Sequence, residues 1–214
     1  MPQFAMTHEF RKALGALFAI QFFSWSAMFA LWIYAMPLVS GQILHQPLVG
    51  AGLQTVLVAV SLGYATYALL GTLGGFALPT LIDRFGHGAV LGSCLLAGAA
   101  GLAVLAAATG PGTMMAAFVA IGIGWSAMGS VPYGLLARMV PEGRGAHFTR
   151  IFGFSTVLPQ IVTTLGLALL APRLLRTDPA QVIAVGGAAM AVAGLLALML
   201  RGYFAAADAN RERW

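Results

Sequence analysis

Long apolar runs constrain this chain more than any other feature of its sequence. Six such runs lie between glycines, prolines and charged residues, and about 20 consecutive apolar residues are enough to cross the hydrocarbon core of a bilayer. Only 8% of the residues are charged, whereas about a quarter are charged in a typical soluble domain. The sequence therefore predicts an all-α membrane protein with six transmembrane helices, at about 13–39, 53–81, 87–108, 112–138, 148–171 and 179–202.

Two short segments flank the predicted transmembrane domain, which covers residues 13–202. Residues 1–12 and 203–214 are expected to lie outside the membrane as an N-terminal segment and a C-terminal tail. The first helix is expected to stay in the mature protein, because the apolar stretch after Arg11 and Lys12 is longer than the core of a signal peptide and is followed by no small-x-small cleavage site. Abundant glycine and alanine in the runs favour close helix packing.

The positions of lysine and arginine predict the orientation in the membrane. One side is expected to hold only Arg173 and Arg176, and the other side holds the remaining cations. Because short cytoplasmic loops are enriched in lysine and arginine, both termini are predicted to be cytoplasmic. The richness in alanine, glycine and arginine favours the inner membrane of a bacterium. The cations are spaced singly, so we expect no nucleic-acid partner despite the net charge of +5. The cytoplasmic set comprises Arg11, Lys12, Arg84, Arg138, Arg144, Arg150, Arg201, Arg211 and Arg213.

Two short sequences recur at nearly the same spacing. WSAM occurs at 25–28 and 125–128, and TVL occurs at 55–57 and 156–158. This spacing pairs the first predicted helix with the fourth and the second with the fifth, as in the two inverted three-helix units that many transporters contain. The expected fold is therefore a 3+3 inverted-repeat bundle. In a chain so rich in alanine, chance repetition is the alternative.

One face of the first predicted helix combines an amide with aromatic rings. Gln21, Trp25, Met28 and Trp32 share this face, with Ser24 beside it, because residues i, i+4, i+7 and i+11 lie on one side of a helix. Such a face suits a sugar, whose hydroxyl groups need hydrogen-bond partners and whose C–H faces pack on rings. The polar and aromatic members are candidate substrate-binding residues. Alternatively, the rings fill the bundle or anchor the helix at the membrane interface.

The fourth predicted helix has a similar face. Trp125 and Tyr133 lie along it and Ser130 adds a hydroxyl, so the two repeat-related helices are expected to line one cavity. Pro132 lies between them, and a proline frees a backbone carbonyl and kinks a helix. Pro132 is therefore a candidate gating residue, unless it only curves the helix around the bundle.

The second and fifth predicted helices complete the candidate substrate site. Tyr64 and Tyr67 lie in the second helix, and Gln160 lies in the fifth beside Pro159, a further candidate gating residue. Within a membrane, a glutamine amide needs a partner in protein, water or ligand. The alternative role for Gln160 is a hydrogen bond between helices, worth about 1 kcal/mol.

The sequence offers little chemistry beyond binding. No ionisable residue lies clearly in the middle of a predicted span, although coupling to protons or to membrane potential generally uses such residues. His8, His45, His87 and His147 flank the spans, and no pair of them has metal-ligand spacing. No nucleophile–base arrangement or phosphate loop appears. We therefore expect no enzyme, metal or cofactor, and we expect Cys94 to be a small buried filler.

Three stretches of the chain resemble one transporter family. QFFSWSAMFALWIYAMP (21–37) is similar to the seventh helix of sucrose-transporter-type proteins, which belong to the glycoside-pentoside-hexuronide:cation symporters of the major facilitator superfamily. GWSAMGSVPYGLLARMVPEGRGAHFTRIFGFSTVLPQIV (124–162) resembles their tenth and eleventh helices, and GGFALPTLIDRFGHG (74–88) resembles the superfamily's loop motif. The resemblance implies the C-terminal six-helix half of a twelve-helix transporter that moves a sugar or similar small polar solute together with a cation.

The resemblance also has local implications. In the loop motif, Asp83 and Arg84 are candidate conformational residues that latch one state by pairing with helix ends or neighbouring charges; an ordinary cytoplasmic flank is the alternative. The family's proton-coupling carboxylate is expected in the other half, in agreement with the uncharged spans here. The chain departs from the family at Gly153, where members commonly carry Asn, and at Arg150, where a small residue is usual.

Two functions are consistent with these features. As half of a symporter, the chain needs a second six-helix half within the lipid, either another copy of itself or a separately encoded chain, to enclose a small polar solute. Alternatively, it is a transporter-derived scaffold or assembly subunit that does not transport and docks on a larger membrane complex. Arg150 and Gly153 slightly favour this alternative.

Overall fold

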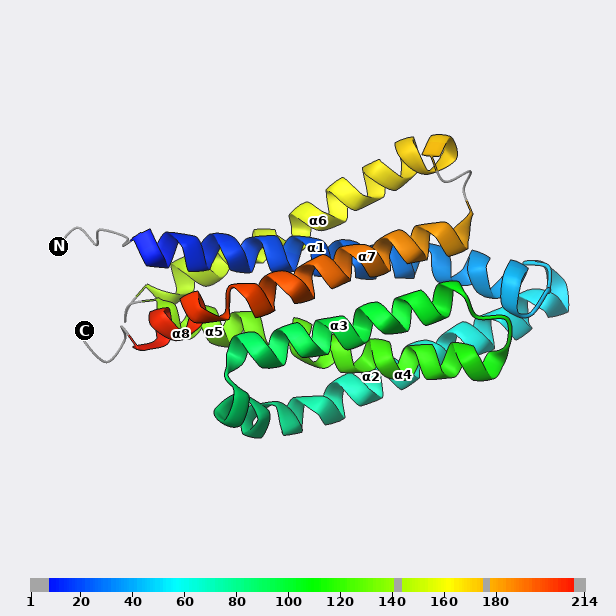
Figure 1. Ribbon diagram of the computed structural model, residues 1–214. Coiled ribbons are helices and arrows are strands. Elements are labelled where there is room, and N and C mark those ends of the chain that lie inside the picture. Colours follow the sequence, from blue (N-terminus) through cyan, green and yellow to red (C-terminus); the bar gives the residue numbers. More distant parts are fainter. Residues whose placement is uncertain (1–7, 141–143, 175–177, 210–214) are drawn as a thin grey trace.

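The computed structural model describes residues 8–140, 144–174 and 178–209, and the regular elements in these ranges are all helices (Figure 1). Arg176, Arg211 and Arg213, which contributed to the predicted orientation, lie outside the described residues. The elements are α1 (His8–Leu38), a π-helical turn (Val39–Ile43), α2 (Gly50–Phe85), α3 (His87–Ala106), α4 (Pro111–Met128), α5 (Val131–Met139), α6 (Gly145–Leu174), α7 (Pro179–Met199) and α8 (Arg201–Ala209).

Six helical segments of the described chain are long and apolar enough to cross a membrane, as expected for an integral membrane protein. Each overlaps one predicted span, so the prediction of an all-α protein with six potential transmembrane helices is confirmed for the described ranges. Because the number of spans is even, the start of α1 and the short α8 lie at the same end of the bundle (Figure 1). The segments are Phe10–Ile43, Gly50–Phe85, His87–Ala106, Pro111–Met139, Gly145–Leu169 and Pro179–Met199.

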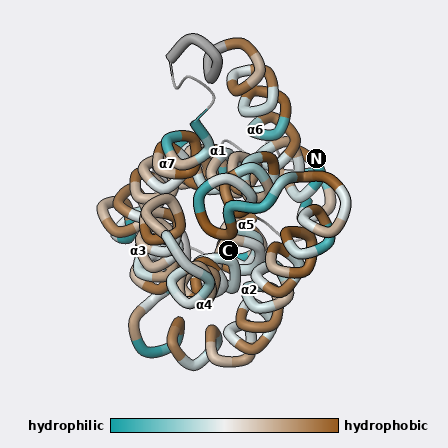
Figure 2. Tube along the Cα trace, turned by 90° about the vertical axis from the view of Figure 1, so that its right-hand side faces the viewer, coloured by the Kyte–Doolittle hydropathy of each residue, from teal (hydrophilic) through white to brown (hydrophobic). Residues whose placement is uncertain are grey.

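The outer surface of the bundle is largely apolar. Large side chains such as Phe76 on α2 and Phe154 on α6 are exposed by 80% and 64%, which would be unfavourable in water. Figure 2, which looks along the helices, shows hydrophobic residues on the outward-facing parts of the helices as well as between them. A helix that is apolar on all sides belongs in a protein core or a membrane, so this surface fits contact with lipid.

The helices pack in a defined order across the bundle. α3 lies between α4 and α7, α7 also packs on α1, α2 packs on α4, and α6 packs on α1. The order is therefore α6–α1–α7–α3–α4–α2, with α6 and α2 at its two ends. These two end helices are the least buried of the six spans.

Glycines allow α3 to approach both of its neighbours closely. A Cβ atom at Gly98 would lie 3.1 Å from the Cα of Gly124 on α4 and 2.8 Å from the sulfur of Met190 on α7. A Cβ at Gly92 would lie 2.8 Å from the carbonyl oxygen of Gly194 on α7. Small residues at such positions let helix backbones pack together in a membrane, which confirms the close packing expected from the glycine- and alanine-rich runs.

A single residue connects α2 to α3. The backbone of Gly86 has φ +82°, a conformation that glycine adopts without the steric penalty of a side chain. Its N–H donates to the carbonyl of Ile82 at 2.7 Å and so ends α2. This link places Asp83 and Arg84, both exposed, at the end of the bundle that also holds α8.

The span Pro111–Met139 is interrupted between α4 and α5, closer to its Met139 end. Pro132 lies in the first turn of α5, and because proline has no N–H, the carbonyl four residues before it loses its helical partner. Ser130 N–H donates to the Ala127 carbonyl at 3.3 Å, and Gly134 N–H donates to the Ser130 carbonyl at 3.0 Å. The fourth span is thus two helices rather than one curved helix. Pro132 predicted a distortion here but not a complete break.

Candidate functional site

Seven aromatic residues from three helices meet inside the bundle, and we call them the aromatic cluster. The ring of Trp125 on α4 has centroid distances of 5.8 Å to Trp25, 6.0 Å to Trp32 and 5.6 Å to Tyr67. These rings meet edge to face, which is a favoured geometry for aromatic pairs. The cluster joins residues up to 100 positions apart in the chain. Its members are Trp25, Phe29 and Trp32 on α1, Tyr64 and Tyr67 on α2, and Phe118 and Trp125 on α4.

Large rings on α1 and α4 and glycines on α2 allow this cluster to form. The α1 helix does not pack closely on α4, and the long side chains of Trp25, Trp32 and Trp125 meet between them. On α2, a Cβ atom at Gly71 would collide with the Trp125 indole, and one at Gly63 would collide with the Phe118 ring. The glycines of α2 therefore make room for the α4 rings.

One hydrogen bond within the cluster holds two helices together. The Trp32 indole N–H donates to the Tyr67 hydroxyl at 3.2 Å, linking α1 to α2. Tyr67 is 8% exposed, and because its oxygen accepts this bond, its own proton is still available for another acceptor. Trp25, Trp32 and Trp125 are half-buried, so part of each ring faces out of the packed core.

We expect Tyr67→Phe to destabilise the protein modestly. The substitution removes the acceptor of the Trp32 N–H, and a hydrogen bond of this kind contributes about 1 kcal/mol. A lower thermal midpoint in detergent, measured by differential scanning fluorimetry, would show this effect. Tyr64→Phe is the matched control, because it removes a hydroxyl from the same cluster but leaves the Trp32 acceptor in place. Equal midpoints for the two variants would contradict the assignment.

Several polar groups beside the cluster are buried without a partner among the described residues. Both amide atoms of Gln21 are in this state, as are the Trp25 indole nitrogen and the hydroxyls of Ser26 and Ser155. Gln21 and Ser24 are completely inaccessible, but the Ser24 hydroxyl donates to the Gln21 backbone carbonyl at 3.3 Å. An unpaired buried polar group is costly, so each of these atoms is a candidate for a hydrogen bond to another molecule.

A second set of ring contacts connects α1, α5 and α6. The Phe152 ring on α6 has centroid distances of 5.0 Å to Tyr133 on α5 and 5.3 Å to Phe18 on α1. Tyr133 therefore packs toward α6 rather than in the aromatic cluster. Pro159, buried on α6, lies two turns further along the same helix.

The structure brings only some of the sequence-predicted residues together. Trp25, Trp32, Tyr64, Tyr67 and Trp125 join the aromatic cluster, and Gln21 and Ser24 lie one turn or less from it on α1. The other polar candidates lie elsewhere. Ser130 is exposed and its hydroxyl donates to the Ser126 carbonyl at 2.8 Å, whereas Gln160 is exposed on α6. The Arg84 guanidinium lies 5.2 Å from the centroid of the neighbouring Phe85 ring.

Sequence reasoning missed four residues that the structure adds. Phe29 and Phe118 belong to the aromatic cluster, and the hydroxyls of Ser26 and Ser155 belong to the unpartnered polar set. Phe29 lies four residues after Trp25 and was identifiable from helical spacing. Ser155 had no such signal, because an isolated serine in an apolar run does not indicate its neighbours.

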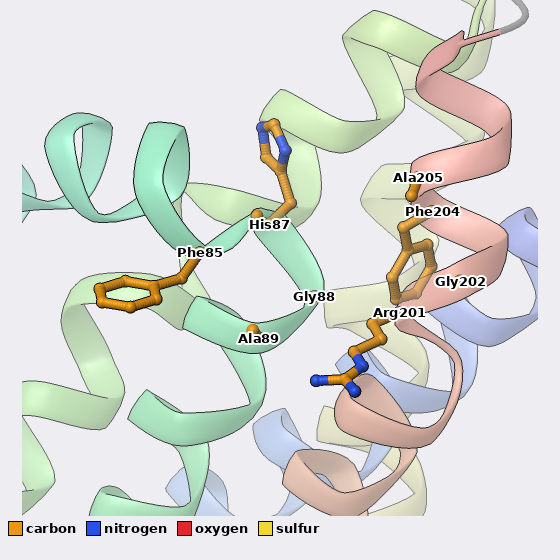
Figure 3. A pocket seen from close by; sticks show the side chains of 9 residues that line it. Phe85, His87, Gly88, Ala89, Arg201, Gly202, Phe204 and Ala205 are labelled. Carbon is orange, nitrogen blue, oxygen red and sulfur yellow. The ribbon is translucent and has the colours of Figure 1, made fainter.

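A separate pocket lies at one end of the bundle, where the α2–α3 link meets α8 (Figure 3). Its volume is about 390 Å³, and in Figure 3 the Arg201 side chain extends toward Ala89 at the start of α3. Among the described residues, no group of three histidine, cysteine, aspartate or glutamate side chains could hold a metal ion. The pocket is lined by Phe85, Gly86, His87, Gly88, Ala89, Arg201, Gly202, Phe204 and Ala205.

Comparisons of the chain with protein-family models, with curated proteins and with solved structures found no match. The aromatic cluster and the polar groups beside it are therefore the features from which function is inferred.

Proposed function

We propose that this chain is one half of a membrane transporter for a sugar or a similar small polar solute, which binds at the aromatic cluster. The observation that carries the proposal is the convergence of three tryptophans and two tyrosines from α1, α2 and α4 inside a membrane-spanning bundle. Aromatic faces pack on the C–H faces of sugars, and a few polar groups fix orientation. The proposal describes a transporter of the major facilitator type.

A 3+3 inverted repeat is part of this proposal. In such a repeat, the first three spans correspond to the last three: α1 to the α4–α5 span, α2 to α6, and α3 to α7. Their contacts can therefore be compared by exchanging each span with its counterpart. Each principal helix contact then becomes another principal contact: α1–α6 becomes α4–α2, α1–α7 becomes α4–α3, and α3–α7 becomes itself. This internal correspondence supports two related three-helix units, which in transporters place the substrate between them.

We further propose that a second six-helix half completes the transporter, either as another copy of this chain or as a separately encoded one. Gln160 is exposed on α6, one of the two least buried spans. A glutamine amide facing lipid would lack a hydrogen-bond partner, which favours protein or a water-filled path at this face. Cation coupling would depend on an acidic residue of the other half, because the described spans here have uncharged middles.

The proposed location is the bacterial inner membrane, with both termini in the cytoplasm. The cations near the end of the bundle that holds α8 support this orientation. In a Cys94→Ala background, a cysteine replacing exposed Gly202 is expected to react with a membrane-impermeant maleimide only after the cells are opened. A cysteine replacing exposed Gly41, at the other end of α1, is expected to react in intact cells. The reverse pattern would overturn the orientation, and labelling of both in intact cells would indicate leaky cells.

Sucrose binding tests the proposed function directly. Three of the four tryptophans lie in the aromatic cluster, so a Trp214→Phe variant reports on the cluster by intrinsic fluorescence. In lipid nanodiscs, we expect saturable changes in this fluorescence with sucrose, maltose or glucose, and uptake of the bound sugar into proteoliposomes when the second half is present. Binding without uptake for every candidate half would favour a non-transporting assembly subunit. If none of these three sugars binds and no other neutral sugar does, the proposed function is wrong.

A further inference from the structure

The buried polar atoms on α1 and α6 form a group that the aromatic cluster does not explain. Gln21 is completely inaccessible, yet neither its amide oxygen nor its amide nitrogen has a partner among the described residues. The Trp25 indole nitrogen and the Ser155 hydroxyl share this condition, and Ser155 is 1% exposed. Most buried polar side-chain atoms in native proteins are hydrogen-bonded, so a set of this kind needs an explanation.

Ring contacts place these groups at the same level of the bundle. Phe10 contacts Phe148, and Phe18 contacts Phe152, so α1 and α6 run in the same direction where they pack. Gln21 and Ser155 each lie three residues beyond the Phe18–Phe152 contact, on the same face of their helices as those rings.

Trp25 connects this level to the aromatic cluster. It follows Gln21 by four residues, so the two side chains are neighbours on α1. The Trp25 ring also meets the Trp125 ring at 5.8 Å between centroids. The unpartnered polar atoms therefore border the aromatic cluster on its α6 side.

The chemistry of these groups selects the kind of molecule that can satisfy them. The Gln21 amide offers two N–H donors and an acceptor, the Trp25 indole offers a donor, and the Ser155 hydroxyl offers both. The described middle parts of the surrounding spans carry no charged side chain. A charged solute would therefore be buried without a counter-ion, which is very unfavourable, whereas hydroxyl groups match the available donors and acceptors.

We propose that the Gln21 amide, the Trp25 indole N–H and the Ser155 hydroxyl form the hydrogen-bonding subsite of the aromatic cluster, and that its solute is an uncharged polyhydroxylated molecule. This inference deepens the proposed function and rests on it. The rings hold the apolar face of the solute, while the three polar groups bind its hydroxyls and exclude charged analogues. Ser155 makes α6 part of the solute site, although the aromatic cluster itself draws on α1, α2 and α4.

The stability of the solute-free protein provides the sharpest test. Substituting a buried glutamine that has no partner without solute should raise stability, whereas substituting a glutamine with structural hydrogen bonds should lower it. We expect Gln21→Met to raise the thermal midpoint by about 2–4 °C, since it removes an unpaired buried amide and keeps a side chain of similar length. Gln42→Met is the matched control. The Gln42 amide nitrogen donates to the carbonyls of Ala106 and Ala108, both at 2.9 Å, so its loss is expected to lower the midpoint.

Solute binding provides the second readout, measured with radiolabelled sucrose in a scintillation proximity assay on the full chain in nanodiscs. We expect Gln21→Met and Ser155→Ala each to weaken sucrose binding about tenfold, the effect of losing one hydrogen bond worth about 1.4 kcal/mol. Ser130→Ala is the control, because the exposed Ser130 hydroxyl already donates to the Ser126 carbonyl of α4. Glucosamine and glucuronate are expected to compete far less well than glucose.

The outcomes separate this inference from the proposed function. A lower midpoint for Gln21→Met, or unchanged sucrose affinity in both Gln21→Met and Ser155→Ala, would overturn the subsite while leaving sugar binding at the aromatic rings intact. Strong competition by glucosamine or glucuronate would overturn the restriction to uncharged solutes. Absence of binding by every neutral sugar in the parent protein would overturn the proposed function and the subsite together.

Discussion

Replacement of Gly124 by leucine is expected to remove most of the folded protein. A Cβ atom at this position would lie 2.9 Å from the Cα of Gly98 and 3.3 Å from the carbonyl oxygen of Cys94 on α3. Both of these neighbours are backbone atoms, which cannot move aside as a flexible side chain does. The whole of α3 would have to shift, and α3 also packs against α7 through Met190.

The expected destabilisation is larger than that of an ordinary overpacked core. Extra methylenes in a well-packed core destabilise by about 1–3 kcal/mol, and here the separation of α3 from α4 also removes the van der Waals packing between the two helices. We expect little monodisperse protein in size-exclusion chromatography after mild solubilisation, and a thermal midpoint well below that of the parent for whatever is recovered.

Gly75→Leu is the matched control for this prediction. Gly75 is an exposed residue of α2, and a Cβ atom there would have nothing within 4 Å. The control adds the same apolar volume to a membrane span without entering a helix interface, so yield and midpoint are expected to stay near the parent values. Normal yield and midpoint for Gly124→Leu would show that α3 and α4 do not pack as described.

The number and approximate positions of the helices were predictable from the sequence, because hydrophobic length is a property of each run alone. Their interruptions were less predictable. Pro132 indicated a kink, but the break into α4 and α5 also depends on Ser130, whose N–H and carbonyl both form turn hydrogen bonds. Pro79 also lies within a span, yet α2 continues past it to Phe85. Proline alone therefore does not determine where a span divides.

The candidate site was predictable to the extent that it follows from helical faces. Trp25 and Trp32 share a face by spacing, and the structure adds Trp125 to them from another helix. The neighbours of each polar residue depend on how helices cross, which no local pattern gives. Trp125 and Tyr133 were predicted to share a face to which Ser130 adds a hydroxyl, yet Ser130 is exposed and its hydroxyl donates to the Ser126 carbonyl of α4. Ser155, which the pattern did not single out, is buried on α6, three residues after Phe152, whose ring contacts Phe18 of α1.

The second large effect is expected at the centre of the aromatic cluster, where Trp125→Ala should weaken both folding and sugar binding. The Trp125 ring touches Trp25, Trp32 and Tyr67, and truncation of a large aromatic side chain in a core costs about 3–5 kcal/mol. Because Trp125 is half-buried, we expect a value near the lower limit, and loss of detectable sucrose binding. Thermal midpoint and scintillation proximity with radiolabelled sucrose measure the two effects separately.

A pair of substitutions that enlarges Gly71 on α2 and shrinks Trp125 on α4 then distinguishes loss of a binding surface from loss of packing. Gly71→Ala alone is expected to destabilise, because its methyl group would collide with the Trp125 indole. Trp125→Phe leaves space at that position, so the double variant is expected to be more stable than the sum of the single effects predicts, as for residues that touch directly. If the double variant recovers stability but still binds sucrose poorly, the indole itself contributes to binding. If Trp125→Ala still folds and its sucrose affinity equals that of the parent, the aromatic cluster serves only packing and the solute binds elsewhere.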